Sequence, residues 1–287
     1  GPNQWSGQPE NAAIMYGIQQ LVMEDYSNRF MICEDSSDSL VAAQSDFCGS
    51  AFSFYLNRDI MQSVNSGSTV DTGVVGWLQQ SRLSSMGLLL ANHDYFAGTR
   101  VFEQFAGNEA KYRLAAATLL TLPGQPFVYY GEEVGMGHTT NSGGDYLLRA
   151  PMSWTAEGGF TTGTPYRAHA HNTAAYNAAS QMADSNSIYH HYKTLIQLRK
   201  NTPALREGDI EVLLDGEVLA YSRSLADSNV LVVLNYSDSA QTPVIPVGQA
   251  STLLSPLANF GSNAVSTTSS GQLNLSLAAQ EIRIYQY

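Results

Sequence analysis

Lysine is scarce in this sequence: Lys111, Lys193 and Lys200 are the only lysines among 287 residues. The formal net charge is −11, and no cluster of Lys or Arg interrupts the acidic balance. Nucleic acids and anionic membrane surfaces are bound through basic patches that neutralise phosphate. The composition therefore argues against nucleic acid and membrane as partners and favours a neutral substrate.

Long hydrophobic runs are also lacking. No apolar stretch approaches the roughly 20 residues that cross a bilayer, and the N-terminus has no signal-peptide pattern. Gly1-Pro2 is a remnant that a cleaved expression tag commonly leaves, so we expect the natural sequence, with any export signal, to begin upstream. A surface rich in Asp, Ser, Asn and Gln is typical of secreted proteins, and we expect a secreted or periplasmic bacterial protein.

Cysteine occurs only twice, at Cys33 and Cys48. Two cysteines are too few for a disulfide framework, and their spacing matches no metal-binding motif. Spacing alone does not bring two Cα atoms within bridging distance. We therefore expect two buried thiols rather than a bridge.

Short apolar runs alternate with helical patterns over the first two thirds of the chain, which is the signature of βα units and a parallel sheet. Apolar residues at helical spacing predict helices around 14–22, 74–78, 110–117 and 188–196, the last of them stopped by Pro203. The predicted strands are 30–33, 51–56, 87–91 and 126–130, and a Gly/Thr/Ser-rich loop follows at 131–184.

From about residue 208 the pattern changes to β-branched and aromatic runs separated by turn residues. These runs predict a small antiparallel sandwich. They lie at 216–225, 229–237, 242–247 and 273–287. The sequence thus predicts two domains, 1–207 and 208–287.

Acidic side chains follow three of the predicted parallel strands: Glu34, Asp94 and the pair Glu132-Glu133. Reactive groups gather at the carboxyl ends of such strands because several loops converge there. A retaining glycosidase needs two carboxyl groups about 5 to 5.5 Å apart, and strand ends in a barrel can meet that spacing. Acidic residues in this position also cap helices or bind loop amides, so the pattern alone leaves both interpretations open.

Histidine pairs occur at His169 and His171 and at His190 and His191. No cysteine or carboxylate stands at ligand spacing beside either pair. Surface histidines are the better interpretation, and the sequence predicts no metal site.

Four motifs then occur in a specific order: LLLANHD at 88–94, LTLPGQPFVYYGEEVGM at 120–136, RAPMSW at 149–154 and GFTTGTPYR at 159–167. Together they resemble the α-amylase family of glycoside hydrolases around the seventh and eighth strands of its barrel. The segment YHHYKTLIQLRKNTPALREG at 189–208 resembles that family's last barrel helix. The resemblance implies an α/β fold, namely the C-terminal half of a (β/α)8 TIM barrel followed by a small antiparallel β-sandwich.

The same resemblance implies roles for individual residues. Asp94 matches the carboxylate that stabilises the transition state, and His93 matches the histidine that binds hydroxyls of the same sugar. Asn92 belongs to this substrate-binding motif, with a structural part in it. The segment RFMICED places Glu34 as the general acid/base, although Cys33 stands where the family usually has glycine. Glu132 and Glu133 match structural residues of the strand-eight motif.

The family's nucleophile, an Asp at the end of strand four, has no counterpart before Glu34. The resemblance therefore implies a fragment, inactive alone, of a retaining hydrolase acting on α-glucosidic linkages of starch-like glucans or malto-oligosaccharides. Its expected partner is the N-terminal barrel half or a second copy of itself. No cofactor is expected in this chain, and calcium is left open for the complete enzyme. The alternative is a non-catalytic carbohydrate-binding or scaffold relative with the same fold.

Overall fold

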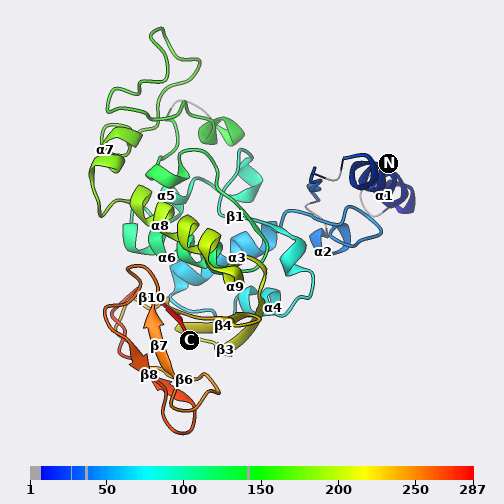
Figure 1. Ribbon diagram of the computed structural model, residues 1–287. Helices are drawn as coiled ribbons and strands as arrows, with labels where there is room; N and C mark the ends of the chain where they lie inside the picture. Colours follow the sequence, from blue (N-terminus) through cyan, green and yellow to red (C-terminus); the bar gives the residue numbers. More distant parts are fainter. Residues whose placement is uncertain (1–7, 27, 36–37, 141–142) are drawn as a thin grey trace.

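The computed structural model describes residues 8–26, 28–35, 38–140 and 143–287. Gly1-Pro2, interpreted above as a tag remnant, lies outside the described residues. A layer of helices covers a twisted antiparallel sheet, and an N-terminal part with α1 and α2 stands to one side of them (Figure 1). None of the described helices combines the length and the apolar character needed to cross a membrane.

The helices of the described ranges begin and end where local signals place them. Asn108 caps α6 by accepting from the Ala110 and Lys111 amides, and Ser187 caps α8 by accepting from His190 N. Their bounds are α1 Pro9–Asp25, α2 Ser39–Ala42, α3 Phe54–Ser66, α4 Val74–Leu78, α5 Val101–Gln104, α6 Glu109–Thr121, α7 Ala178–Ala183, α8 Ile188–Asn201 and α9 Pro203–Glu207, with single 3₁₀ turns η1 Leu83–Ser85, η2 Tyr95–Ala97, η3 Glu132–Val134 and η4 Gly144–Leu148.

Parallel pairing joins four segments in chain order. Cys33 bridges Ala51, Phe52 bridges Gly87, and β1 (Gly87–Leu89) pairs with β2 (Gln125–Phe127). The predicted parallel order is confirmed at these positions, but the strands are shorter than expected. The predicted strand at 51–56 is wrong beyond Ser53, because α3 begins at Phe54 and turns its apolar residues into one buried helical face.

The chain after α9 forms antiparallel sheets, as predicted. The described strands are β3 Asp209–Leu214, β4 Val218–Leu225, β5 Ser228–Asn235, β6 Val244–Pro246, β7 Leu253–Pro256, β8 Val265–Ser266, β9 Gln272–Asn274 and β10 Ile282–Gln286. They pair as a six-stranded sheet in the order β3-β4-β5-β10-β7-β8 and a two-stranded sheet β6-β9.

The predicted run at 273–287 is not one strand. β9 pairs with β6, whereas β10 lies between β5 and β7 in the larger sheet. The break between them includes Gln280, whose φ of 55° is left-handed and ends an extended path. Strands β3, β7 and β8 were not anticipated, since their runs are short or mixed with polar residues.

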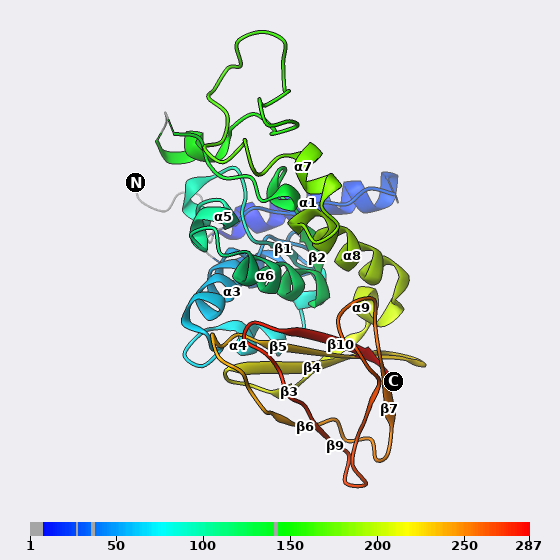
Figure 2. The ribbon, with the colours of Figure 1, turned by 90° about the vertical axis from the view of Figure 1, so that its left-hand side faces the viewer.

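Alternate residues of the large sheet enter two different cores. On β4 and β5, Leu219, Tyr221 and Val232 join the core beneath the helices, whereas Val218 and Leu231 face the small sheet. This period of two is what a strand buried on both faces requires. Figure 2 shows the resulting stack, with the helices above the large sheet and β6 and β9 below it.

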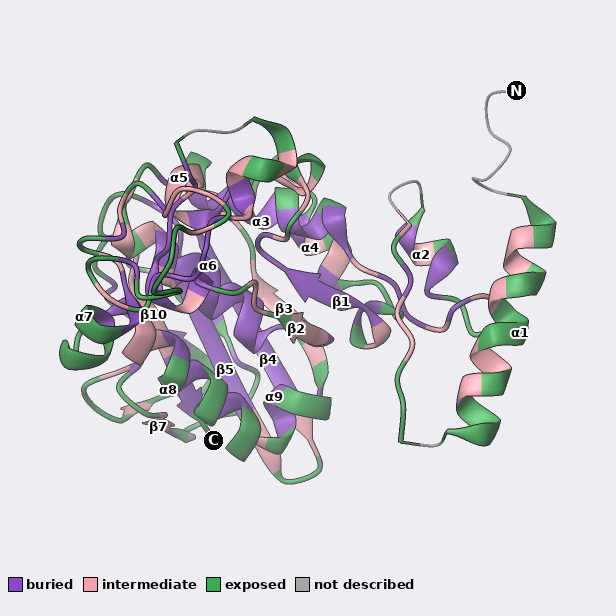
Figure 3. Ribbon diagram, turned by 90° about the horizontal axis from the view of Figure 1, so that it is seen from above, coloured by how far each residue is buried: buried purple, intermediate pink, exposed green. Residues whose placement is uncertain are grey.

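Helix α1 is the exception to this burial. It forms over the predicted range, yet none of its residues is buried, and Ile14, Leu21 and Met23 are each more than half exposed. Figure 3 shows the helix standing apart from the buried body of the molecule, in exposed and intermediate colours only. Only part of its apolar face is covered: Met15 packs against the main core, whereas Ile14, Leu21 and Met23 stay mostly exposed.

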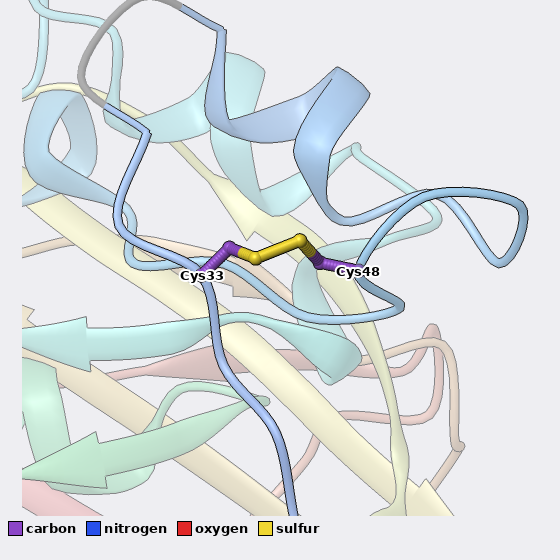
Figure 4. The surroundings of a disulfide bond; sticks show 2 residues. All are labelled: Cys33 and Cys48. Atoms are coloured by element: carbon purple, nitrogen blue, oxygen red, sulfur yellow. A yellow bond between two sulfur atoms is a disulfide. The ribbon is translucent and has the colours of Figure 1, made fainter. Parts of the chain in front are cut away.

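The expectation of two free thiols is wrong, because Cys33 and Cys48 form a disulfide (Figure 4). Their Cα atoms are 6.1 Å apart. Cys48 lies just before the segment that pairs with Cys33: Cys33 N donates to Ser50 O and Phe52 N donates to Cys33 O. The parallel pairing thus brings together two cysteines that sequence spacing left unconnected.

Candidate active site

Asp94 lies beyond the carboxyl end of β1, at the start of η2, with its side chain about one-fifth exposed. Asn92 Oδ1 accepts from Asp94 N at 2.8 Å, which fixes the turn after the strand. His93 Nε2 is 3.3 Å from Asp94 Oδ2. The three residues singled out in the sequence are therefore held together, with the carboxylate and the imidazole both open to solvent.

Arg149 connects this turn to the long loop after β2. Its Nη2 donates to Asp94 Oδ1 at 2.8 Å, its Nη2 also reaches Asp145 Oδ2 at 3.2 Å, and its Nε donates to His93 O at 2.9 Å. Asp145 Oδ1 in turn accepts from Tyr95 N at 2.8 Å. The sequence assigns no role to Arg149 or Asp145, although Arg149 begins the RAPMSW motif, because only the fold brings this loop back to β1.

A buried arginine anchors the loop that carries Arg149. Arg100 donates through Nε and Nη2 to Leu148 O, at 3.0 and 2.6 Å, and through Nη1 to Tyr130 O at 2.8 Å. Its guanidinium also lies 4.7 Å from the ring centre of Tyr129. Carbonyl oxygens and aromatic faces thus stabilise a cation that is only 2% exposed, and they fix the position of the neighbouring Arg149.

Glu34 follows Cys33 directly, at the carboxyl end of the first paired segment. Its side chain is exposed and lines a hollow of about 230 Å³ with Met15, Phe47 and the bridged Cys33. Among the described residues, no hydrogen bond or ion pair joins Glu34 to Asp94. The structure thus brings Asp94, His93 and Asn92 together and places Glu34 separately, at the end of a parallel segment that is divided from β1 by the segment at Ala51 and Phe52.

Glu132 is buried rather than presented to solvent. Tyr192 donates to its Oε1 at 2.7 Å, and Tyr112 donates to its backbone carbonyl at 2.8 Å. Burial raises the pKa of Glu132 to about 8 against the opposing effect of the Tyr192 hydrogen bond. Burial also raises the pKa of Glu133. Glu132 thus packs the loop against α6 and α8.

Three further side chains that the sequence did not connect, one on α5 and two in the loop after η3, lie close together. Glu103 Oε1 lies 2.5 Å from His171 Nε2 and 3.8 Å from His138 Nε2. His169 does not belong to this group, and His190 and His191 point to backbone carbonyls of Met182 and Arg113. The group of Glu103, His138 and His171 is the one set of possible metal ligands found within the described ranges.

Comparison with known proteins agrees with this architecture. The family model for the α-amylase catalytic domain matches residues 2–208. The chain is 35% identical over 198 residues to α-amylase 3 of Dictyoglomus thermophilum, covering 65% of this chain and 38% of that protein. It is 32% identical over 187 residues to the oligo-1,6-glucosidase of Halalkalibacterium halodurans, covering 50% of this chain and 33% of that protein.

Among solved structures, the α-amylase of H. orenii superposes with a TM-score of 0.75 at 22% identity, over all of this chain and 58% of its own. At that identity the likeness concerns the fold. The chain spans well under half the length of the two curated relatives that it matches. With the family model covering more than two thirds of the sequence and the LLLANHD turn in place at the end of β1, the chain belongs to the α-amylase family.

Proposed function

We propose that this chain is part of a retaining glycoside hydrolase that acts on α-glucosidic linkages of starch-like glucans or malto-oligosaccharides. One observation carries the proposal: Asp94 is held at the end of β1 by Arg149, with His93 beside it and both side chains accessible. An exposed imidazole 3.3 Å from the carboxylate adds little to the stability of the fold, but it places two polar groups where a sugar could bind. The relatives, named as an α-amylase and an oligo-1,6-glucosidase, support this class of linkage.

In this proposal Asp94 stabilises the developing positive charge on the sugar, and His93 donates to a hydroxyl of the same ring. Arg149 acts on Asp94 as a positioning residue, because it fixes one carboxylate oxygen and leaves the other toward His93. Asn92 shapes the turn. Glu34 protonates the leaving oxygen and then activates the water that cleaves the glycosyl intermediate.

The complete reaction needs a nucleophilic carboxylate, which we propose is supplied by another segment of the barrel. The exposed apolar face of α1 supports this view, since Ile14 and Leu21 would be covered by such a segment. We propose that the N-terminal half of the barrel covers this apolar face. The alternative is that two copies of the chain pair through the same edge. Any calcium would bind with that additional segment. The Cys33–Cys48 bridge supports a secreted or periplasmic location, where disulfides persist.

A non-catalytic relative is the second candidate. The bridge beside Glu34, in the place of the small residue usual in the family, favours it, because the disulfide fills space next to the proposed acid/base. The two candidates differ in one outcome: only the enzyme loses turnover when a carboxylate at the site is replaced.

The decisive variant is Asp94→Asn, tested in the complete catalytic domain on maltotriose and starch. We expect kcat to fall by about 10³-fold or more, with little change in substrate binding, because the lost contact belongs to the transition state. Asp227→Asn, at an exposed turn of the sandwich, is the matched control and should keep parental activity. Activity of Asp94→Asn within tenfold of the parent would contradict the assignment.

A further inference from the structure

Glu103, His138 and His171 bring a carboxylate and two imidazoles to one point, and none of the described hydrogen bonds or ion pairs joins their side chains to Asp94 or Glu34. Glu103 lies on α5, His138 follows η3, and His171 lies in the last part of the loop before α7. The three ligand atoms all lie within 4.8 Å of one another. From this geometry we propose that the cluster binds one zinc ion. The ion would hold the loop segment from His138 to His171 against α5 at both of its ends.

The hydrogen bonds of His138 prepare it as a ligand. Its Nδ1 lies 3.0 Å from Thr139 O, a carbonyl that can only accept, so Nδ1 carries the proton. Nε2 is then left with its lone pair, and it is Nε2 that faces Glu103. A histidine that donates its other ring nitrogen to a backbone carbonyl is the usual arrangement around protein-bound zinc.

The carboxylate of Glu103 is also arranged as a metal ligand would be. Oε1 accepts from His138 N at 3.1 Å, which orients the group. Oε2 is buried and has no hydrogen-bond partner among the described residues. An unsatisfied buried carboxylate oxygen is costly, and a cation beside it would offset that cost.

A glycine allows the side chains of the cluster to come together. A Cβ at Gly137 would lie 2.8 Å from Glu103 Oε1 and 2.8 Å from His171 Nε2. Gly137 is not in the left-handed region, so its backbone does not require glycine; the closeness of the ligand atoms does. Any other residue here would press its side chain into the centre of the cluster.

The donor set selects the metal. Calcium and magnesium take oxygen ligands, whereas two imidazoles and one carboxylate with a solvent position form a common zinc site. Tetrahedral zinc separates its ligand atoms by about 3.4 Å, so the Glu103–His171 pair would open by about 1 Å and the Glu103–His138 pair would close slightly. His171 is 37% exposed, which leaves room for a water as the fourth ligand.

The loop between His138 and His171 contains Asp145 and Arg149. An ion shared by both ends of this loop and α5 would restrict the segment that positions Asp94. The simpler interpretation is an ion pair between Glu103 and His171. That interpretation predicts no effect of zinc.

The test is titration of the full 287-residue chain, freed of metal, with zinc chloride and separately with cobalt chloride. We expect one equivalent of zinc to bind and raise the melting temperature, and cobalt to give the visible absorption of a four-coordinate site that zinc then abolishes. His171→Gln and Glu103→Gln should each weaken binding by at least about tenfold. His169→Gln, the neighbouring histidine outside the cluster, should bind zinc as the parent does.

His171→Gln keeps the test decisive if Glu103→Gln does not fold, because His171 is the most exposed member of the cluster. Circular dichroism of each variant without metal separates lost binding from lost folding. The proposal is overturned if the folded parent binds no zinc, or if His171→Gln binds it as tightly as the parent.

Discussion

The buried carboxyl of Glu132 should make the stability of this protein fall as pH rises. It is 2% exposed, its Oε1 accepts from Tyr192, and its Oε2 has no partner among the described residues. Burial raises its pKa from 4.5 to about 8. The folded state therefore holds a proton that the unfolded state releases at much lower pH.

The sign follows from proton linkage. Between pH 4.5 and 8 the folded state binds more protons at this site, so the free energy of unfolding decreases with pH. The favourable contribution is fully present below pH 4.5 and is lost as pH passes through about 8. A difference of this size corresponds to something on the order of 5 kcal/mol at high pH, which is a large part of the stability of an ordinary domain.

Glu132→Gln removes the titration while keeping the shape and the acceptor for Tyr192. Urea unfolding from pH 5 to pH 9 should therefore show a variant that is more stable than the parent at pH 9 and similar to it at pH 5. Glu157→Gln, at an exposed loop position, is the control and should follow the parent throughout. Parallel curves for the parent and Glu132→Gln would refute the buried, protonated Glu132.

Two further perturbations test the packing of α8 and of the segment that carries Glu34. His191 packs against Phe260, and burial lowers its pKa to about 4. Its contribution to stability is therefore present above pH 6.5 and should be lost as pH falls through about 4. His191→Gln should reduce this acid loss of stability in thermal melts, and an unchanged dependence on pH would contradict it. The Cys33–Cys48 bridge closes a separation of 15 residues, so replacing both cysteines by serine should cost about 3 kcal/mol in urea unfolding, and no cost would refute a stabilising bridge.

The regular parts of this fold were predictable because their signals are local. Period-two and helical patterns located β4, β5 and α6 closely, and charge at a strand end located Asp94. The prediction of a strand at 51–56 was wrong beyond Ser53, because a short apolar run is equally compatible with a buried helix. Helix α1 was predicted as a helix, but its exposure depends on what it packs against, which no local pattern contains.

Most of the contacts that define the site could not be predicted from the sequence. Arg149 meets Asp94 only because the loop after β2 returns across the end of β1. The disulfide depends on parallel pairing between the segments at Cys33 and Ala51. The group of Glu103, His138 and His171 draws on three separate parts of the chain, so no ligand spacing marks it. In each case tertiary structure, rather than local sequence, supplies the neighbour.

The stereochemistry of the first product tests the proposed function most directly. Glu34 acting as acid/base in a double displacement retains the configuration at the anomeric carbon, whereas direct attack by water inverts it. Proton NMR during the first turnovers of the complete catalytic domain on a malto-oligosaccharide resolves the two anomers before they interconvert. The account predicts that the α-anomer appears first, and initial formation of the β-anomer would contradict it.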